Sequence, residues 1–331
     1  MIARKTARRG LAAAAGVFAL AVGLAFAASA QTAWKHGIVE AKGDSGFLFQ
    51  AAEGGFGKKR NLDINMVQFT GGPTALKALI AGELDSFEGS PVVAFPAMHQ
   101  NADIKIIGCN WPKMTYTIFA AKNIATPADL KGKTIGVSAP GSLPALFGRL
   151  ALEAAGVSDA EVRYANAGGS ADRVRAIGSG VVAAAASSSE FTVNADALNI
   201  KPLLAGAEVT PRFVKVCIMT TGAKIAQRRK DMVTFLAAEM EGLTFALGNK
   251  DATIALARKV AHLPAGDKTA EFIYDEAIKY NAVAADLAIP LEDLQWTDDQ
   301  MVRLAALREK ADVHKFIDDS IRTDALAAVK K

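Results

Sequence analysis

Two glycine-led segments of this chain could bind a negatively charged group. Gly71-Gly72 and Gly168-Gly169 each stand before a segment whose apolar residues have helical spacing. The first turn of a helix leaves backbone N–H groups unpaired, and the helix dipole favours an anion there. Glycine has no Cβ, so a ligand can approach these amides closely. The pattern predicts that Gly72 and Gly169 help to hold an anionic group.

Serine hydroxyls occur in two further loops. Ser138, Gly141 and Ser142 precede a third expected helix, and Ser188 lies in a serine-rich loop after an expected strand. A hydroxyl can both donate a hydrogen bond to a ligand and accept one from it. The alternative is that Ser142 and Ser170 are ordinary N-caps, each contributing about 1 kcal/mol to its helix. The sequence leaves this choice open.

Carboxylates stand at comparable positions. Asp44 follows the first expected strand, Glu88 follows the third, and Glu190 ends the serine-rich loop. Carboxylates at the mouth of a cleft would select an amine or a ring N–H and would repel a bare inorganic anion. The alternative is that they are solvated surface charges.

Trp111 and Lys113 follow an expected strand near a crossing between two lobes, where Lys113 either reaches an anionic ligand or is a solvated linker charge. Phe47 and Phe87 could stack on a ligand, with core packing as the alternative. The full set of candidate ligand-binding residues is Asp44, Ser45, Thr70, Gly71, Gly72, Glu88, Gly89, Ser90, Trp111, Ser138, Gly141, Ser142, Gly168, Gly169, Ser188 and Glu190.

Nothing in the sequence has the pattern of a metal or nucleophile site. The four histidines are too scattered for metal-ligand spacing, and neither a Gly-x-Ser-x-Gly elbow nor a phosphate-binding Gly-x-x-x-x-Gly-Lys-Ser/Thr loop occurs. Gly178-Ser179-Gly180 resembles part of a dinucleotide fingerprint, but it follows an expected helix and precedes a strand, which is the reverse order. We therefore expect no cofactor, no metal and no enzymatic activity.

Short β-type runs alternate with helical periodicity through the first two-thirds of the chain, and helices follow one another from about residue 225. Strands are expected at residues 37–39, 64–69, 104–108, 115–120, 134–137, 162–164 and 181–185. Helices are expected at residues 74–81, 91–100, 143–155, 171–177, 232–247, 252–260, 269–280 and 298–307. Alternating strands and helices predict an α/β fold with largely parallel sheets covered on both faces.

A weak internal repeat indicates two lobes of similar topology. Residues 71–90 and 168–189 both read as loop, helix, glycine stop, strand and polar loop. Low-complexity Ala/Gly composition is the alternative source of the match. In parallel α/β sheets, ligands bind in the crevice at the carboxyl ends of the strands, where these polar loops belong. Two such lobes facing each other predict a central cleft.

The first thirty residues have the features of a secretory signal. Basic Arg4, Lys5, Arg8 and Arg9 precede an apolar run at residues 11–27 and then Ala28-Ser29-Ala30, after which cleavage is expected. A retained membrane anchor is the alternative. Arg8-Arg9 resembles a twin-arginine signal, although Ala7 replaces the expected hydroxyl residue. We expect a periplasmic protein.

Composition and charge further limit the classes of protein to which this chain could belong. The chain has 331 residues, 51% of them hydrophobic, which suffices for roughly two domains with substantial cores. Its formal charge of +4 resides in the signal, so the remainder is near neutral and no nucleic-acid partner is expected. The two cysteines, Cys109 and Cys217, lie in apolar strand-like runs. Export permits a disulfide, but the pattern favours two buried free thiols.

The chain resembles periplasmic binding proteins of the alkanesulfonate, taurine, nitrate and thiamine-pyrimidine type. The resemblance lies in EGGFGKKRNLD at residues 53–63, in residues 69–73 with AGELD at 81–85, and in TPADLKGKTIGV at 126–137 running into Pro-Gly-Ser at 140–142. It covers almost the whole chain after the signal. Glu190 matches a position that is often acidic in the family, but Ser189 stands where an aromatic often precedes it.

The resemblance implies a bilobal type II periplasmic-binding fold with a helical C-terminal segment packed on the first lobe. Residues 31–111 and 212–331 would form the first lobe, and residues 112–211 the second. The partners would be a small-molecule ligand and the permease and ATPase subunits of an ABC importer, with membrane contact only through that importer and the chain itself a monomer. The cargo would be a small organic anion, a sulfonate or carboxylate that could also bear an amine. The alternatives are a heteroaromatic such as a thiamine-precursor pyrimidine, an enzyme on the same fold, or a sensory module.

Overall fold

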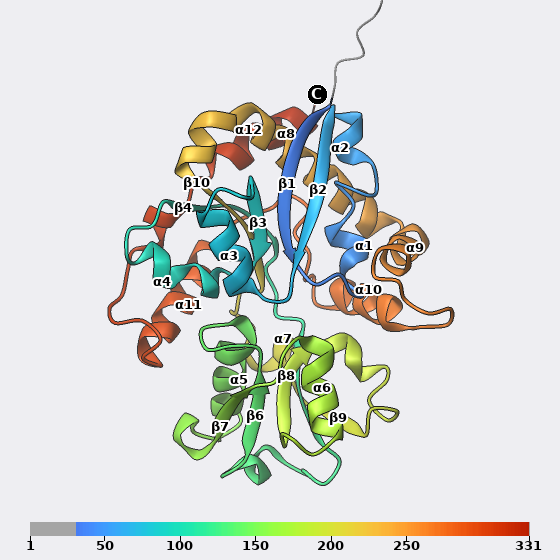
Figure 1. Cartoon of the computed structure of the whole chain (residues 1–331), viewed down its shortest axis with the longest axis vertical. Coiled ribbons are helices and arrows are strands. Elements are labelled where there is room, and N and C mark those ends of the chain that lie inside the picture. The colour runs from blue at the N-terminus through green and yellow to red at the C-terminus, as the bar shows by residue number, and fades with distance from the viewer. Residues whose placement is uncertain (1–30, 331) are drawn as a thin grey trace, which may run out of the picture. The chain divides into compact units, whose positions relative to one another are not determined.

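The computed structural model describes residues 31–330, and two five-stranded sheets organise this part of the chain (Figure 1). The first sheet has the order β2-β1-β3-β10-β4 and the second β7-β6-β8-β5-β9. The first contains β1 (Thr32–Val39), β2 (Leu62–Phe69), β3 (Ser86–Gly89), β4 (Ile104–Trp111) and β10 (Val216–Thr221). The second contains β5 (Tyr116–Ala121), β6 (Thr134–Val137), β7 (Arg163–Asn166), β8 (Ala184–Ser188) and β9 (Ile200–Ala205). Each sheet with its helices is called a lobe below.

The two lobes share one topology. In each sheet three strands are parallel neighbours, β2-β1-β3 and β7-β6-β8, and the next strand, β10 or β5, runs antiparallel to them. Helix α3 (Gly72–Ile80) leads to β3, as α6 (Ser170–Gly178) leads to β8. Gly82 and Gly180 end these helices at φ 79° and 76°, where glycine is favoured. The repeat predicted from sequence is therefore present in the fold.

Helices cover both faces of each sheet. In the second lobe, α5 (Leu143–Ala154) packs Leu146 and Phe147 on one face, while α6 packs Val174 and Ile177 on the other. The remaining helix of this lobe is α7 (Gly206–Val209). Alternation along β5, with Ile118 in one core and Phe119 in the other, separates the two faces.

The C-terminal helices pack on the first lobe, as expected. They are α8 (Gly222–Gly248), α9 (Lys250–Val260), α10 (Thr269–Lys279), α11 (Leu291–Arg303) and α12 (Ser320–Val329). Helices α8 and α12 lie against the sheet of this lobe. Phe235 of α8 stacks on Trp34 of β1 with ring centroids 5.3 Å apart, and α8 is kinked at Arg228. Short helices complete the lobe: α1 (Ser45–Leu48), α2 (Phe56–Lys59) and α4 (Phe95–Met98).

Strand β9 and helix α12 are among the elements that lacked a clear sequence signal. Strand β9 contains Lys201 and Pro202, and it lies at the edge of its sheet, where a proline is tolerated. Helix α12 buries only Ile321 and Ala325, so its apolar periodicity is weak. Helix α11 begins at Leu291, earlier than the expected start at residue 298.

The expectation of two free thiols is wrong, because Cys109 and Cys217 form a disulfide. The chain leaves the first sheet after β4 and returns as β10, which pairs antiparallel with β4. Register shifts on either side of Ile218 accompany this pairing and bring Cys217 against Cys109. A sequence without known strand pairing could not reveal this proximity.

The expected domain boundaries fall in the connections between the sheets, after β4 and before β10. The assignment of residues to domains stays a prediction. Within residues 31–330, no helix is long and apolar enough to cross a membrane. The expected signal peptide lies outside the described residues.

Candidate functional site

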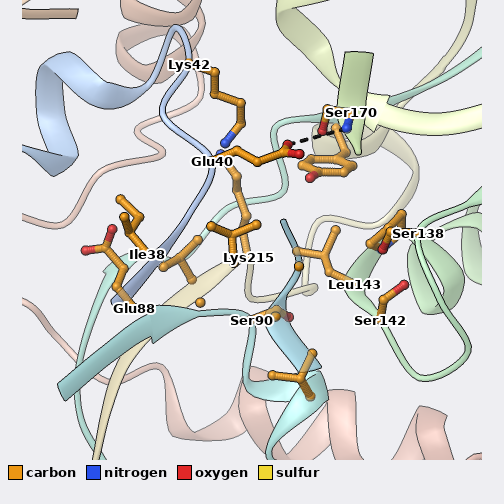
Figure 2. A pocket seen from close by; sticks show the side chains of 18 of the residues that line it. Ile38, Glu40, Lys42, Glu88, Ser90, Ser138, Ser142, Leu143, Ser170 and Lys215 are labelled. Atoms are coloured by element: carbon orange, nitrogen blue, oxygen red, sulfur yellow. Dashed lines mark hydrogen bonds between the residues drawn. The ribbon is translucent and has the colours of Figure 1, made fainter. Parts of the chain in front are cut away.

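A cavity of about 80 Å³ lies at the carboxyl ends of the parallel strands and is lined by both lobes (Figure 2). A cavity of roughly 10–15 Å³ holds one water molecule, so this cavity admits a ligand of several heavy atoms. The lining comprises Ile38, Val39, Glu40, Lys42, Asp44, Leu48, Thr70, Gly71, Gly72, Glu88, Gly89, Ser90, Val93, Tyr116, Ser138, Ser142, Leu143, Pro144, Ser170, Arg173, Lys215 and Val216.

The cavity brings together many of the residues predicted from sequence. Those in its lining are Asp44, Thr70, Gly71, Gly72, Glu88, Gly89, Ser90, Ser138 and Ser142. Those outside the lining are Ser45, Trp111, Gly141, Gly168, Gly169, Ser188 and Glu190. Several of the latter support residues that do line it: Gly168 accepts from Arg173, and the Ser45 hydroxyl accepts from the Lys42 amide.

Arg173 is the most informative residue that sequence analysis missed. Its side chain is buried and donates to three uncharged oxygens: Ala186 O at 2.7 Å, Gly168 O at 2.8 Å and Ser170 Oγ at 3.0 Å. Burial lowers the pKa of this guanidinium from its ordinary value, although Tyr116 and Glu40 oppose the shift. A guanidinium has five N–H groups, so two remain for a ligand. The charge of Arg173 thus lies in the cavity wall without a salt bridge to any of residues 31–330.

Two lysines and one aspartate form a charge cluster beside Arg173's cavity. The Asp44 carboxylate lies 3.2 Å from Lys42 Nζ and 3.4 Å from Lys215 Nζ, and Lys215 also donates to Thr115 Oγ1 at 2.8 Å. Burial opposes ionisation of Asp44, but the two lysines outweigh it and hold the pKa of Asp44 below its ordinary value. Asp44 is therefore engaged by protein cations, and the cluster carries one more positive than negative charge.

Trp111 acts beneath this cluster rather than in the cavity. Lys215 Nζ lies 4.0 Å from the centroid of the Trp111 ring, a cation–π contact that supports the lysine.

The other candidates near the crossing between the lobes lie outside the cavity. Lys113 donates to Pro211 O at 3.4 Å, so it bridges the two interlobe connections. Phe47 and Phe87 are buried in the core, and Tyr116 is the aromatic residue that lines the cavity.

Neither Ser142 nor Ser170 caps its helix with its hydroxyl, although Ser142 stands at the N-cap position. Ser142 occupies the N-cap position of α5, but its hydroxyl donates to Ala139 O at 2.7 Å instead of accepting from the helix. Ser170 is the first residue of α6, and its hydroxyl accepts from Arg173. The first-turn amides of α3 and α5 likewise have no side-chain cap. These helix ends are left to other acceptors.

Glu88 is buried where the cavity meets the α8 side of the first sheet. One carboxylate oxygen accepts from Asn110 at 2.5 Å and lies 3.8 Å from His36 Nε2, while the other has no hydrogen-bond partner among residues 31–330. Burial, together with the charge of Glu88, raises the pKa of Glu239 on α8 well above its ordinary value. Ser90 also has a buried hydroxyl without a partner in the described chain. The unpartnered oxygen of Glu88 and the hydroxyl of Ser90 remain able to bind a ligand.

Glu190 does not line the cavity, but it connects the two lobes by a hydrogen bond. Its carboxylate accepts from the Gly43 amide of the first lobe at 2.8 Å. Burial raises the pKa of Glu190 from 4.5 to about 7, against the opposing attraction of Lys42. Glu276 of α10 hydrogen bonds to the hydroxyl of Ser189, the residue before Glu190, and Thr115 O lies 3.0 Å from the same hydroxyl oxygen. Burial raises the pKa of Glu276 as well.

Ligand affinity is expected to fall as pH rises from about 5 to about 7. Opening the lobes would return Glu190 towards its ordinary pKa of 4.5, so the closed form holds the proton more tightly. The advantage of the closed form is complete below pH 4.5 and is lost as pH rises through about 7. Each pKa unit caused by closure is worth about 1.4 kcal/mol. Calorimetric titration with ethanesulfonate, which stays ionised throughout, measures the slope.

Glu190→Gln is the matched control, because the amide has the same shape but does not titrate in this range. We expect its affinity profile to be much flatter than that of the wild type. The residual slope reports Glu276, which faces Lys215 and Lys279. Equal slopes for wild type and variant would contradict a role for Glu190.

The missed residues carried weak but readable signals. Ser170, Arg173, Val174 and Ile177 form the buried face of α6, so helical spacing places an arginine among core positions. Lys215 stands between buried Val214 and the start of β10. Glu40 and Lys42 follow β1 directly, as the predicted Asp44 does. Long charged side chains are usually exposed, which is why these were passed over.

Comparison with solved structures identifies the fold as that of periplasmic binding proteins. The periplasmic nitrate-binding protein NrtA of Synechocystis superposes with a TM-score of 0.76 at 16% identity, covering 90% of this chain and 89% of its own. The alkanesulfonate-binding protein SsuA of Xanthomonas axonopodis, solved with MOPS, gives 0.71 at 18%, covering 87% and 98%. DszB with biphenyl-2-sulfinic acid gives 0.65 at 12%, covering 89% and 99%.

A match to a family model identifies the family of this chain. Residues 43–253 match the family model described as NMT1/THI5 like, and this chain belongs to that family. A Brucella abortus protein that is provisionally designated a binding protein is 36% identical over 108 residues, which are 32% of this chain and 33% of the relative. The match thus spans about a third of the curated relative's length.

Proposed function

We propose that this chain is the solute-binding component of an ABC importer and that it captures a small organic anion between its lobes. The observation that carries the proposal is the buried charge of Arg173 in the cavity wall, bonded only to uncharged oxygens. A buried charge without a counter-ion is costly, so an anionic ligand would compensate it. The uncapped α3 and α5 N-termini face the same cavity and add to the positive potential.

The remaining lining supports an organic ligand of limited size. Ile38, Leu48, Val93 and Leu143 provide apolar surface that a bare inorganic anion would leave without a partner. The cavity of about 80 Å³ matches a ligand with a short carbon chain. A sulfonate or carboxylate with such a chain satisfies both conditions. An amine on that ligand would find an acceptor in the unpartnered oxygen of Glu88.

A thermal-shift screen tests the proposal. The probes are ethanesulfonate, taurine, propionate, nitrate and 4-aminopyrimidine, in a buffer without sulfonates. A ligand present at about 100 times its Kd stabilises the fold by about 2.7 kcal/mol. We expect stabilisation by at least one organic anion and little by nitrate. A response confined to 4-aminopyrimidine would replace the anion by a heteroaromatic ligand.

The proposed transport role also requires that the protein interact with an importer. The ligand-loaded protein should bind the permease of an importer, and the ATPase of that importer should be stimulated by it. We infer that residues 31–111 with 212–331 and residues 112–211 move as two bodies on ligand binding, because the sheets of the lobes are joined through the connections after β4 and before β10. Recovery of the ligand in chemically changed form would favour an enzyme on this fold.

A further inference from the structure

Glu40 crosses the cavity from one lobe to the other. It follows the last residue of β1 in the first lobe, and its carboxylate accepts a hydrogen bond from the Ser170 amide at the start of α6 in the second lobe, at 3.4 Å (Figure 2). No other side chain of the first lobe among residues 31–330 hydrogen bonds to this end of α6. Glu40 therefore places a negative charge where the sequence predicted the anion of a ligand.

The backbone at Glu40 is held in an unusual conformation. Its φ is 48°, in the left-handed region that non-glycine residues rarely adopt. The Glu40 amide donates to Phe69 O at 3.1 Å, which ties this conformation to the end of β2. Strained backbone of this kind persists where surrounding structure enforces it, and it is enriched at functional sites.

Gly169 is shaped to receive this carboxylate. A Cβ at Gly169 would lie 2.3 Å from Glu40 Oε1, closer than atoms can approach. The space beside Gly169, inferred from sequence as room for a ligand, is occupied here by the end of a flexible side chain of the protein itself. The positive φ is a feature of the Glu40 backbone, while the hydrogen bond to α6 and the position beside Gly169 are features of its side chain.

We propose that Glu40 is an internal competitor for the ligand: its carboxylate bridges the lobes of the unliganded protein at the α6 N-terminus, and an incoming anion displaces it. The inference rests on the proposed function, since it concerns the same cavity. Asp172 of α6 already accepts from the Gly169 amide at 3.3 Å, so the Ser170 amide, which Glu40 occupies, is the donor for which a ligand anion would compete. The affinity for a ligand is therefore the intrinsic affinity reduced by the fraction of molecules in which Glu40 holds the site.

Glu40→Gln tests the inference, because the amide keeps the shape and loses the charge. Small-angle scattering of the unliganded variant should show a larger radius of gyration than the wild type, since the bridge between the lobes is weakened. Calorimetric titration with ethanesulfonate should show binding roughly threefold to tenfold tighter, as expected if the bridged form makes up about 70–90% of unliganded wild type. Glu83→Gln, at an exposed carboxylate of the same lobe, is the matched control and should change neither quantity.

The two measurements separate this inference from the proposed function. Scattering needs no ligand, so an unchanged radius of gyration in Glu40→Gln overturns the bridge even if organic anions bind. Unchanged or weaker ethanesulfonate binding in Glu40→Gln overturns the competition. Unchanged binding would mean that Glu40 has no role in binding, and weaker binding would mean that it contacts the ligand. If wild type binds no anion from the screen, the proposed function fails, and the competition fails with it, while a change in scattering still establishes the interlobe bridge.

Discussion

Replacing Arg173 by methionine is expected to weaken binding of an organic anion by more than about 30-fold, because truncating one partner of a buried charge pair typically costs about 2–5 kcal/mol. Methionine keeps an aliphatic stem but removes the charge and all five donors. The loss should appear in calorimetric titration with ethanesulfonate, or with the anion that stabilises the wild type best in the thermal screen. The effect is large because the guanidinium is buried among uncharged partners and cannot be replaced by solvent.

The controls must separate binding from folding, since Arg173 also holds the Gly168 and Ala186 carbonyls. Arg175→Met is the matched variant on the same helix: its side chain is 65% exposed, pairs with Asp172 and lies outside the cavity. We expect it to bind as the wild type does. Arg173→Lys keeps the charge and loses the planar fork, so it should fall between wild type and Arg173→Met. Equal affinity of a folded Arg173→Met and wild type would remove the arginine from the site.

The sequence predicted the positions of the cavity loops better than the chemistry inside them. Helices α3 and α6 could be read from apolar spacing, and Gly82 and Gly180 marked their ends, because local periodicity and glycine conformations are properties of short segments. Loops after parallel strands must gather at one edge of a sheet, so the sequence predicts that Gly72, Glu88 and Ser142 lie near one another, and all three line the cavity. These inferences need no knowledge of the opposite lobe.

What the sequence could not provide was the pairing of charged residues that lie far apart in the chain. A carboxylate at Asp44 suggests selection of an amine, but Lys42 and Lys215 pair with it, and Lys215 lies just before β10, far along the chain. Gly169 was read as room for a ligand anion, but Glu40 from the other lobe fills it. The Lys215 pair is set by how distant segments of the first lobe pack together, and the Glu40 contact by how the second lobe faces the first, neither of which a local pattern encodes.

Reducing the Cys109–Cys217 disulfide is expected to lower the free energy of unfolding by about 3–5 kcal/mol. The bond closes a loop of 108 residues that contains the whole second sheet, and a cross-link over a loop of this length restricts the unfolded chain strongly. Urea unfolding of the protein with and without reductant, followed to equilibrium, measures the change. The Cys109→Ala, Cys217→Ala double variant should unfold near the reduced wild type and should not respond to reductant.

A thiol titration of the denatured, unreduced protein gives the complementary check: we expect no free thiol, and two would contradict the bond. The disulfide joins β4 to β10, which remain neighbours through their own hydrogen bonds when it is reduced. Both cysteines are fully buried in the first sheet and neither lines the cavity. Reduction should therefore change the Kd for an anion far less than it changes stability. An equally large loss of affinity would instead mean that the strands leading to the interlobe connections depend on the bond to position the second lobe.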